Sequence, residues 1–419
     1  MNAGPMQNTG PYRTLLSINN YYYPRGGAEV VFLEQNRMLE ASGWNVVPFA
    51  MQHPRNLPSP WSGYFVDELE FGGDYSMLGK LRRAAKVVYS REARTKLSRL
   101  LDVAQPGVAH LHNIYHHISP SILGLLSQRQ IPTIMTLHDL KLVCPAYKML
   151  APDGICERCR GGKLGNVVRH RCVKGSLALS SLVYVEARLH ALMNTYQANV
   201  DQFVVPSRFF RDKLTAWGVP AEKLRYLPNF VDVERYQPAA RAGDHFLYFG
   251  RLGPEKGVAT LIRAAQRAGV PLKIAGTGPE EHTCRQLVRA GGGDVQFLGY
   301  LTGPALHDAV RAARAVVLPS EWYENAPMSL LESYALGVPV IGADIGGIPE
   351  LIRVEQTGAC FTSGDDGELA GALQRFASLS DAQITAMGRS ARALVQREFS
   401  AELYRTRLLG LYREMRVPC

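Results

Sequence analysis

The stretch Pro319–Glu350 (PSEWYENAPMSLLESYALGVPVIGADIGGIPE) decides the fold of this chain. It follows the apolar run 315–318, which has the length of a buried parallel strand. Apolar residues in its middle recur at helical spacing until Gly337, which suits the C′ position that ends a helix. A second apolar strand, 338–342, comes next. The stretch therefore predicts a strand–loop–helix–strand unit of an α/β protein.

Two carboxylates in this unit are the first candidate functional groups. Glu324 lies in the loop, and Glu332 lies in the helix among leucines that face the core. The loop ends at a helix N-terminus, where free backbone N–H groups and the helix dipole favour an anion. An ordinary crossover with two solvated carboxylates is one interpretation of this pattern, and a site for a polar, anionic ligand is the other.

Length and composition indicate a globular protein of two domains. The chain has 419 residues, of which 46% are hydrophobic and 20% charged, enough for two sizeable cores. It contains no apolar run near the ~20 residues that span a bilayer, and its first residues, MNAGPMQN, lack the regions of a signal peptide. We therefore expect a cytoplasmic protein. The net charge of +10 suits phosphorylated substrates, an anionic membrane surface or a polyanion.

The first half of the chain opens with another strand–helix–strand unit, which has Gly26–Gly27 at its first turn. This turn lacks the G-x-G-x-x-G pattern, which argues against a dinucleotide-dependent dehydrogenase. A plain tight turn would explain the two glycines, and so would a close approach of the backbone to a diphosphate or an acceptor. The order of strand, Pro-Ser and helix occurs at 202–207 and again at 316–320, which predicts two similar α/β halves.

Histidines follow two strands of the first half. A short strand leads through His110 and His112, and the buried strand 131–137 ends in His138–Asp139. Because α/β sheets bind ligands at the carboxyl ends of their strands, His138 is a candidate site residue. The alternative is a histidine that only bonds to the aspartate beside it. We expect His110 to be structural and His112 to line an interdomain cleft.

Cations follow the first strand of the second half. This strand ends in Gly250–Arg251, and Lys256 comes five residues after the arginine, just before a helix. Two cations at a helix N-terminus would neutralise a departing diphosphate, on which negative charge grows as a bond to it breaks. Two unrelated surface cations are the alternative. The next strand ends in a glycine turn that contains Gly276.

Together these motifs resemble those of the retaining glycosyltransferases of family 4, also called glycosyl transferases group 1. The resemblance covers about the whole chain beyond residue 12, with the motifs in the family's order. It implies the GT-B arrangement, an α/β fold in which two Rossmann-like domains with parallel sheets face each other across a cleft. It divides the chain into an N-terminal acceptor domain (12–235), a nucleotide-sugar domain (244–393) and a C-terminal helix (394–419) that crosses back to the first domain.

The resemblance also assigns roles to residues of this sequence. Arg251 and Lys256 would neutralise the diphosphate of the donor. Glu324 would bond to hydroxyls of the transferred sugar, Glu332 would bond to the ribose, and His138 would face the transferred sugar. The catalytic set is then His138, Glu324, Arg251 and Lys256, and the donor-binding set adds Gly26, Gly27, Gly250, Gly276, Ala326, Pro327, Met328, Ser329 and Glu332. Many relatives have more glycine where this chain has Asn325–Ala326–Pro327, which leaves the pose of the donor sugar open.

The implied activity is transfer of a hexose-type sugar, with retention of configuration, from a UDP- or GDP-sugar to a lipid-linked or polysaccharide acceptor. No cofactor is needed for this chemistry. Two other classes stay open: another sugar-nucleotide enzyme of this fold, such as a phosphorylase or epimerase, and a non-catalytic basic protein that binds membranes. We expect no nucleic-acid partner, because the basic run lacks interleaved aromatics and no nucleic-acid motif is recognised.

Four of the seven cysteines lie in one segment, 144–172, which the family pattern does not require but some bacterial members share in similar form. The spacing C-x11-C-x2-C-x12-C is typical of a structural four-thiolate zinc site formed by Cys144, Cys156, Cys159 and Cys172. Metal would supply folding energy that such a glycine-rich, basic loop lacks. An iron–sulfur cluster is less favoured because its usual spacings are shorter, and four unrelated thiols are the remaining alternative.

Residues 78–100 read as one basic, amphipathic helix. Its cations alternate with apolar residues, and Glu92 opposes them. Such a helix suits an anionic lipid surface, which would place the protein on the inner face of the cell membrane. A solvated helix that packs its apolar side on the domain is the alternative. The cations are Lys80, Arg82, Arg83, Lys86, Arg91, Arg94, Lys96 and Arg99.

Overall fold

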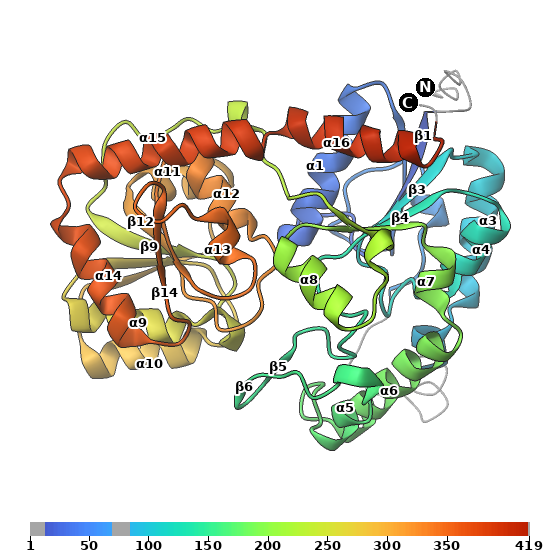
Figure 1. The fold of residues 1–419 in the computed structure, drawn as a ribbon, viewed down its shortest axis with the longest axis horizontal. Coiled ribbons are helices and arrows are strands. Elements are labelled where there is room, and N and C mark those ends of the chain that lie inside the picture. The colour runs from blue at the N-terminus through green and yellow to red at the C-terminus, as the bar shows by residue number, and fades with distance from the viewer. Residues whose placement is uncertain (1–12, 69–83, 418–419) are drawn as a thin grey trace.

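The structure, a computed structural model, describes residues 13–68 and 84–417. It contains two α/β domains side by side, each built on a parallel sheet with helices packed around it (Figure 1). The prediction of two Rossmann-like domains is therefore confirmed. No helix in the described ranges combines the length and apolar character needed to cross a membrane.

The N-terminal sheet has the strand order β2-β1-β3-β4-β7-β8 within the described residues, and all neighbouring strands are parallel. Its strands are β1 (Thr14–Ile18), β2 (Asn45–Phe49), β3 (Val108–Leu111), β4 (Thr133–Thr136), β7 (Gln202–Val205) and β8 (Leu224–Tyr226). Its helices include α1 (Gly27–Ala41), α3 (Arg91–Ala104), α4 (Leu123–Gln128), α5 (Asn166–Arg169), α6 (Leu177–Leu192), α7 (Thr195–Asn199) and α8 (Arg208–Ala216). The central strands are buried along their whole length, which explains why each reads as an apolar run.

The C-terminal sheet has the strand order β11-β10-β9-β12-β13-β14, again with parallel neighbours throughout the described part. Its strands are β9 (His245–Phe249), β10 (Leu272–Ala275), β11 (Val295–Gly299), β12 (Ala313–Leu318), β13 (Val340–Ala343) and β14 (Gly358–Phe361). Its helices include α9 (Val258–Ala268), α10 (Glu281–Gly291), α11 (Gly303–Arg311), α12 (Met328–Ala335), α13 (Ile348–Leu351), α14 (Asp366–Ser378) and α15 (Asp381–Glu398).

This strand order fixes where a ligand can bind. The chain leaves β9 toward β10 and β11 on one side, and later returns to build β12, β13 and β14 on the other. The crevice at the carboxyl ends of β9 and β12 is the switch point at which doubly wound sheets bind nucleotides. The cation motif after β9 and the stretch that opens with Pro319 after β12 therefore meet at one place.

The last helix, α16 (Ala401–Glu414), runs from the C-terminal domain across to the N-terminal one, in line with α15 (Figure 1). Its Tyr404, Leu408 and Tyr412 pack in the core cluster of β1 and β3. Val231 bonds to the Phe399 carbonyl (N–O 3.0 Å), so the two chain crossings lie together. The sequence placed the start of this helix at residue 394, which is wrong. Residues 394–398 belong to α15, which ends at Glu398. Ser400 then caps the start of α16.

Two predicted helices are interrupted. Within the described part of segment 78–100, residues 84–88 are helical, Tyr89 and Ser90 break the helix, and α3 then starts at Arg91. Ser90 causes this break because its hydroxyl caps the N–H of Ala93. The sequence over 177–196 also has the pattern of one long helix, but the structure divides it into α6 and α7 at a left-handed Asn194, with φ of 50°.

Candidate donor site

The loops after β9 and β10 approach each other through glycines. Gly250 and Gly276 both have positive φ, 151° and 147°. A Cβ on Gly276 would lie 1.9 Å from the carbonyl oxygen of Gly250, so no larger residue fits there. The two glycines bring the backbone turns together at the base of the crevice, and packing explains their positions.

Lys256 and Glu324 form the centre of the site. The Nζ of Lys256 donates to Oε1 of Glu324 over 2.6 Å, and the Ser320 hydroxyl donates to the same oxygen over 2.7 Å. Burial alone would raise the pKa of Glu324, which is 8% exposed, but the charge and hydrogen bond of Lys256, with the hydrogen bond from Ser320, hold this pKa below its usual value. The carboxylate therefore stays ionised and ready to accept hydrogen bonds.

Arg251 lies beside this pair and is held by a second carboxylate. Its guanidinium pairs with Oε1 of Glu255, whose side chain is 1% exposed. The other oxygen of Glu255 accepts from Nζ of Lys148, 3.3 Å away, which comes from the N-terminal domain. Three cations thus gather where the resemblance implies a diphosphate.

Two helix N-termini face this region from opposite domains. α1 begins at Gly27, and a Cβ built on that glycine would lie 3.6 Å from Cγ of Met328, the first residue of α12. Ala326 and Pro327 lead into α12, and the Ala326 carbonyl accepts from the Asn229 side chain over 2.8 Å. Gly27 at the start of α1 therefore lies against the side chain of Met328 at the start of α12, so the N-termini of these two helices meet between the domains.

The turn Asn325–Ala326–Pro327 ties the domains together. The Asn325 amide donates to the Leu137 carbonyl over 2.9 Å, and its Oδ1 accepts from the Ser207 hydroxyl over 2.8 Å. The glycine pair after β13 packs on the same turn, since a Cβ on Gly347 would lie 1.9 Å from the Asn325 carbonyl oxygen. Larger residues at this pair would push the turn away from the N-terminal domain.

His138 lies at the end of β4, next to this contact, and is partly exposed. Its Nε2 bonds to Nδ1 of His112 over 2.8 Å, and the two rings stack. Burial lowers the pKa of His138 to about 4, so it is neutral near pH 7. His112 itself is fully buried under His138, so the prediction that it lines the cleft is wrong. His110 is buried and bonded to Thr136, Gln35 and Tyr412, as a structural histidine would be.

Glu332 lies on α12 with its side chain partly exposed. Burial, with a smaller repulsion from Glu34 of α1, raises its pKa to about 7. It thus differs from Glu324, whose pKa is lowered. A carboxyl of this kind is suited to exchanging hydrogen bonds with ligand hydroxyls rather than to pairing with a cation.

Comparisons with known proteins now decide the family. The model of Glycosyltransferase Family 4 matches residues 25–235, and the model of Glycosyl transferases group 1 matches residues 237–393. The chain belongs to glycosyltransferase family 4. The boundary between the two matches falls at the linker that follows β8 and precedes β9.

Individual relatives of this family 4 chain differ in the share of the chain that the alignment covers. A D-inositol 3-phosphate glycosyltransferase of Jonesia denitrificans is 26% identical over 94% of this chain and 92% of its own length. A GDP-mannose-dependent monoacylated alpha-(1-6)-phosphatidylinositol monomannoside mannosyltransferase of Corynebacterium glutamicum is 32% identical over 44% of this chain and 55% of its own. The chain spans about half the length of several curated relatives that it matches, this one included.

The fold of this family 4 chain has solved counterparts. The crystal structure of Anabaena HepE in complex with UDP and glucose superposes with a TM-score of 0.65 and 16% identity, and the match covers 96% of this chain and all of that one. At this identity the likeness establishes the fold, which is the GT-B arrangement.

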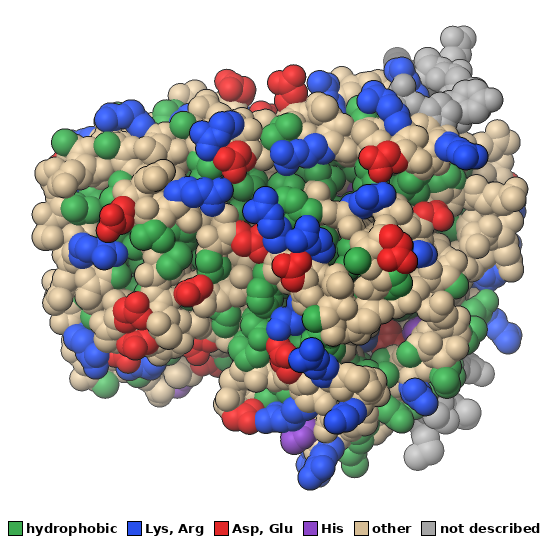
Figure 2. Space-filling view, in the orientation of Figure 1, with side chains coloured by type: hydrophobic (Ala, Val, Ile, Leu, Met, Phe, Trp, Pro, Cys, Tyr) green, Lys and Arg blue, Asp and Glu red, His purple; other side chains and the backbone are tan. Residues whose placement is uncertain are grey.

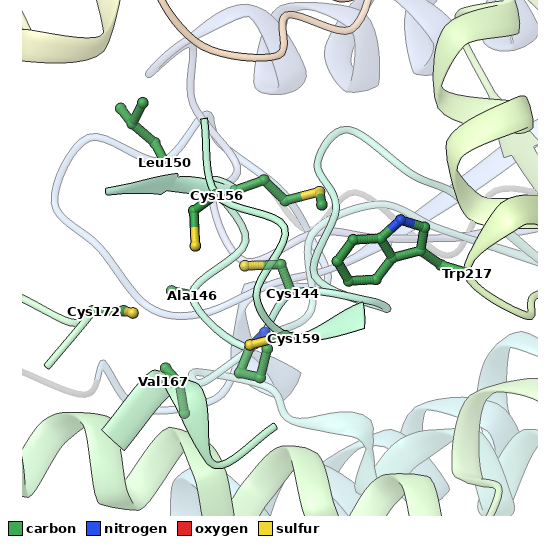
Figure 3. Close-up of a pocket in the computed structure, with 10 residues that line it drawn as sticks. Cys144, Ala146, Leu150, Cys156, Cys159, Val167, Cys172 and Trp217 are labelled. Atoms are coloured by element: carbon green, nitrogen blue, oxygen red, sulfur yellow. The ribbon is translucent and has the colours of Figure 1, made fainter. Parts of the chain in front are cut away.

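The four cysteines of segment 144–172 line one pocket of the N-terminal domain (Figure 3). All four carry free thiols, and Trp217 of the segment after α8 lines the pocket with them. Burial, together with the charges of the other three cysteines, raises the pKa of the Cys159 thiol to about 12. Within the described residues, no three His, Cys, Asp or Glu side chains are arranged as a formed metal site. The four thiols that the sequence groups therefore line one pocket, and the zinc site stays a prediction.

The described cations of the basic segment are largely occupied. Lys86 and Lys96 both pair with Glu92, and Arg94 bonds to Gln128. Lys80, Arg82 and Arg83 lie outside the described residues. Figure 2 shows Lys and Arg spread over both domains of one face and mixed with Asp and Glu.

Several residues of the site were missed from the sequence. Lys148 and Glu157 belong to the cysteine segment and bond to the other domain, and Glu255 pairs with Arg251. Asn325 was singled out from the sequence only for the sugar pose, and its bond to the N-terminal domain was missed. Glu255 could have been found, since it directly precedes Lys256. The others act through contacts between domains, which no local spacing records.

Proposed function

We propose that this chain is a glycosyltransferase that moves a hexose-type sugar from a nucleoside-diphosphate sugar to an acceptor with retention of configuration. The observation that carries the proposal is the Lys256–Glu324 pair at the switch point, with Arg251 beside it. Two cations and two helix N-termini suit a diphosphate, while an ionised carboxylate suits sugar hydroxyls. The family and its motifs support the same chemistry.

Each residue has a distinct part in this proposal. Lys256 and Arg251 stabilise the charge that grows on the diphosphate as the glycosidic bond breaks. Glu324 orients the transferred sugar through its hydroxyls, and Glu332 accepts from the ribose. His138, neutral near pH 7, contacts the sugar from the N-terminal side. Retention follows in this scheme if the acceptor attacks from the face that the leaving diphosphate occupies, without a covalent sugar–enzyme intermediate.

The donor experiment separates this proposal from its alternatives. Wild-type protein should gain thermal stability from UDP or GDP, because only a ligand of the native state raises stability. HepE binds UDP and glucose, and the Corynebacterium relative is named for GDP-mannose, so both bases belong in the screen. NMR of the product then reads the anomeric configuration. Inversion of configuration would refute retention, sugar release by phosphate would indicate a phosphorylase, and no stabilisation by either nucleotide would refute donor binding.

We propose a lipid-linked acceptor on a further observation. Val185, Leu189, Leu192 and Met193 lie on one face at the end of α6 and are at least 40% exposed. Arg188 lies within this stretch, so an anionic membrane suits it. Vesicles of phosphatidylglycerol and phosphatidylcholine should co-sediment wild-type protein, and Leu192→Ser with Met193→Ser should reduce binding. Equal binding of the double variant would refute this surface, and a polysaccharide acceptor would then be favoured.

A further inference from the structure

The cysteine segment of the N-terminal domain touches both donor loops of the C-terminal domain. Lys148 reaches Glu255 with an Nζ–Oε2 distance of 3.3 Å, and Glu157 accepts from the Tyr323 hydroxyl over 2.9 Å. Glu157 lies between the two cysteines of the C-x-x-C pair and also pairs with Lys213 of α8. The partners of Lys148 and Glu157 are the chain neighbours of the two residues in the central ion pair. The segment is therefore positioned to act at the site itself.

Lys148 faces a surplus of positive charge. Burial lowers its pKa, and the nearby charges of Arg251 and Lys256 lower it further. Lys148 and Arg251 both pair with Glu255, and Lys256 pairs with Glu324. These five groups therefore carry one positive charge in excess. A phosphate group supplies the missing negative charge and relieves the repulsion that Lys148 experiences.

The backbone around Lys148 is held in a costly conformation. Tyr147 and Met149 have φ of 57° and 47°, in the left-handed region that non-glycine residues rarely adopt. The Tyr147 N–H donates to the Cys144 carbonyl over 2.8 Å, and the Cys156 N–H donates to the Met149 carbonyl over 2.8 Å. Strain of this kind persists where the surroundings enforce it, often at ligand sites. The cysteine-bearing chain on both sides enforces the turn that presents Lys148.

A buried ion pair anchors the same turn from behind. Nζ of Lys141 donates to the Pro145 carbonyl over 3.0 Å and to Glu186 of α6 over 2.8 Å. The two charged side chains are 4% and 1% exposed. Lys148, in contrast, is 32% exposed, so its ammonium can reach a ligand while its turn stays fixed.

We propose that Lys148 is a phosphate-binding residue of the substrate site, supplied across the cleft by the cysteine segment. The proposal rests on the proposed function and names a third cation for it. The phosphate belongs to the nucleoside-diphosphate donor or to the diphosphate of a lipid-linked acceptor. Before substrate binds, Glu255 holds the ammonium of Lys148 beside Arg251. Because Lys148 and Arg251 come from different domains, a phosphate between them also favours the closed arrangement of the two domains.

The test measures phosphate binding by the full-length protein in the absence of transfer. Lys148→Met keeps the length of the side chain and removes its charge. Its affinity for UDP or GDP, whichever the wild type binds, should fall about tenfold, the effect of one charged hydrogen bond, while affinity for the matching nucleoside stays unchanged. Lys148→Arg should retain most of the binding. Lys163→Met, at an exposed lysine of the same segment, is the matched control.

Farnesyl diphosphate serves as a second probe, for the acceptor side. If Lys148→Met loses affinity for farnesyl diphosphate but not for UDP or GDP, the phosphate that Lys148 binds is that of the acceptor. Unchanged affinity for all three compounds overturns the proposal, and so does an equal loss of nucleoside binding, which indicates a merely structural role. If the wild type binds neither UDP nor GDP, the proposed function itself fails, and this inference fails with it.

Discussion

Lys256 and Glu324, 68 positions apart in the chain, meet in an ion pair of 2.6 Å that joins the loops after β9 and β12. These loops follow the two strands that flank the switch point of the C-terminal sheet. The two groups depend on each other, since the ammonium favours the ionised carboxylate and the carboxylate fixes the ammonium near the diphosphate position that we propose. This mutual dependence determines what each substitution should do.

Replacement of Glu324 should affect catalysis more than folding. Glu324→Gln keeps the shape and can still accept from Ser320 and Lys256, so the melting temperature should change little. The amide binds sugar hydroxyls less strongly than a carboxylate, and kcat should fall on the order of 100-fold, as for loss of one preorganised polar group. Steady-state transfer assays check this, with exposed Glu222→Gln as the control. Turnover within a few-fold of wild type would remove Glu324 from the catalytic set.

Replacement of Lys256 should change the pH dependence of activity. The pKa of Glu324 lies below its usual value because of the Lys256 ammonium, so burial will raise this pKa once the ammonium is gone. In Lys256→Met the acidic limb of the kcat/KM profile should therefore move to higher pH, and donor binding should weaken. Lys256→Arg should keep the limb near that of wild type. An unshifted limb in Lys256→Met would show that Glu324 is not the group that titrates.

The fold was accessible from sequence because the buried strands include apolar runs bounded by turn residues, as 315–318 and 338–342 are. The donor motifs were accessible for the same reason, since Arg251, Lys256 and Glu324 stand next to strand ends. The spacing of residues along the sequence could not predict which side chains bond between the two domains. The role of Asn325 could not be predicted from the sequence. In the structure its side chain donates to the Leu137 carbonyl and accepts from the Ser207 hydroxyl.

The errors also have a local physical cause. The helix over 78–100 was read from periodicity alone, although the Ser90 hydroxyl can cap a new helix start and so interrupt it. His112 was placed in the cleft because it follows a strand. His112 directly follows the last residue of β3, and its side chain lies buried beneath His138, to which it bonds.

The histidines under the site should make stability depend on pH. An unfolded histidine binds a proton as the pH falls through about 6.5, but folded His138 binds one only near pH 4. Between these values the unfolded state holds more protons, so the free energy of unfolding must fall as the pH falls. His138→Gln should lessen this decline between pH 6.5 and 4. Urea unfolding at several pH values measures the slope, and exposed His282→Gln should leave it as in wild type. Parallel slopes for His138→Gln and wild type would refute the prediction.

We propose that the four thiols of the cysteine segment bind one zinc ion, which holds the turn that carries Lys148. They line one pocket, in which burial raises the pKa of the Cys144 thiol, and a bound cation would favour the thiolate form. Full-length protein purified without chelator should contain about one zinc per chain by elemental analysis. Cys159→Ser should lose the zinc, melt at lower temperature and bind UDP or GDP more weakly, whereas Cys360→Ser, outside the segment, should retain the metal. If wild type contains no more zinc than Cys159→Ser, the segment is held by packing and by the Lys141–Glu186 pair alone.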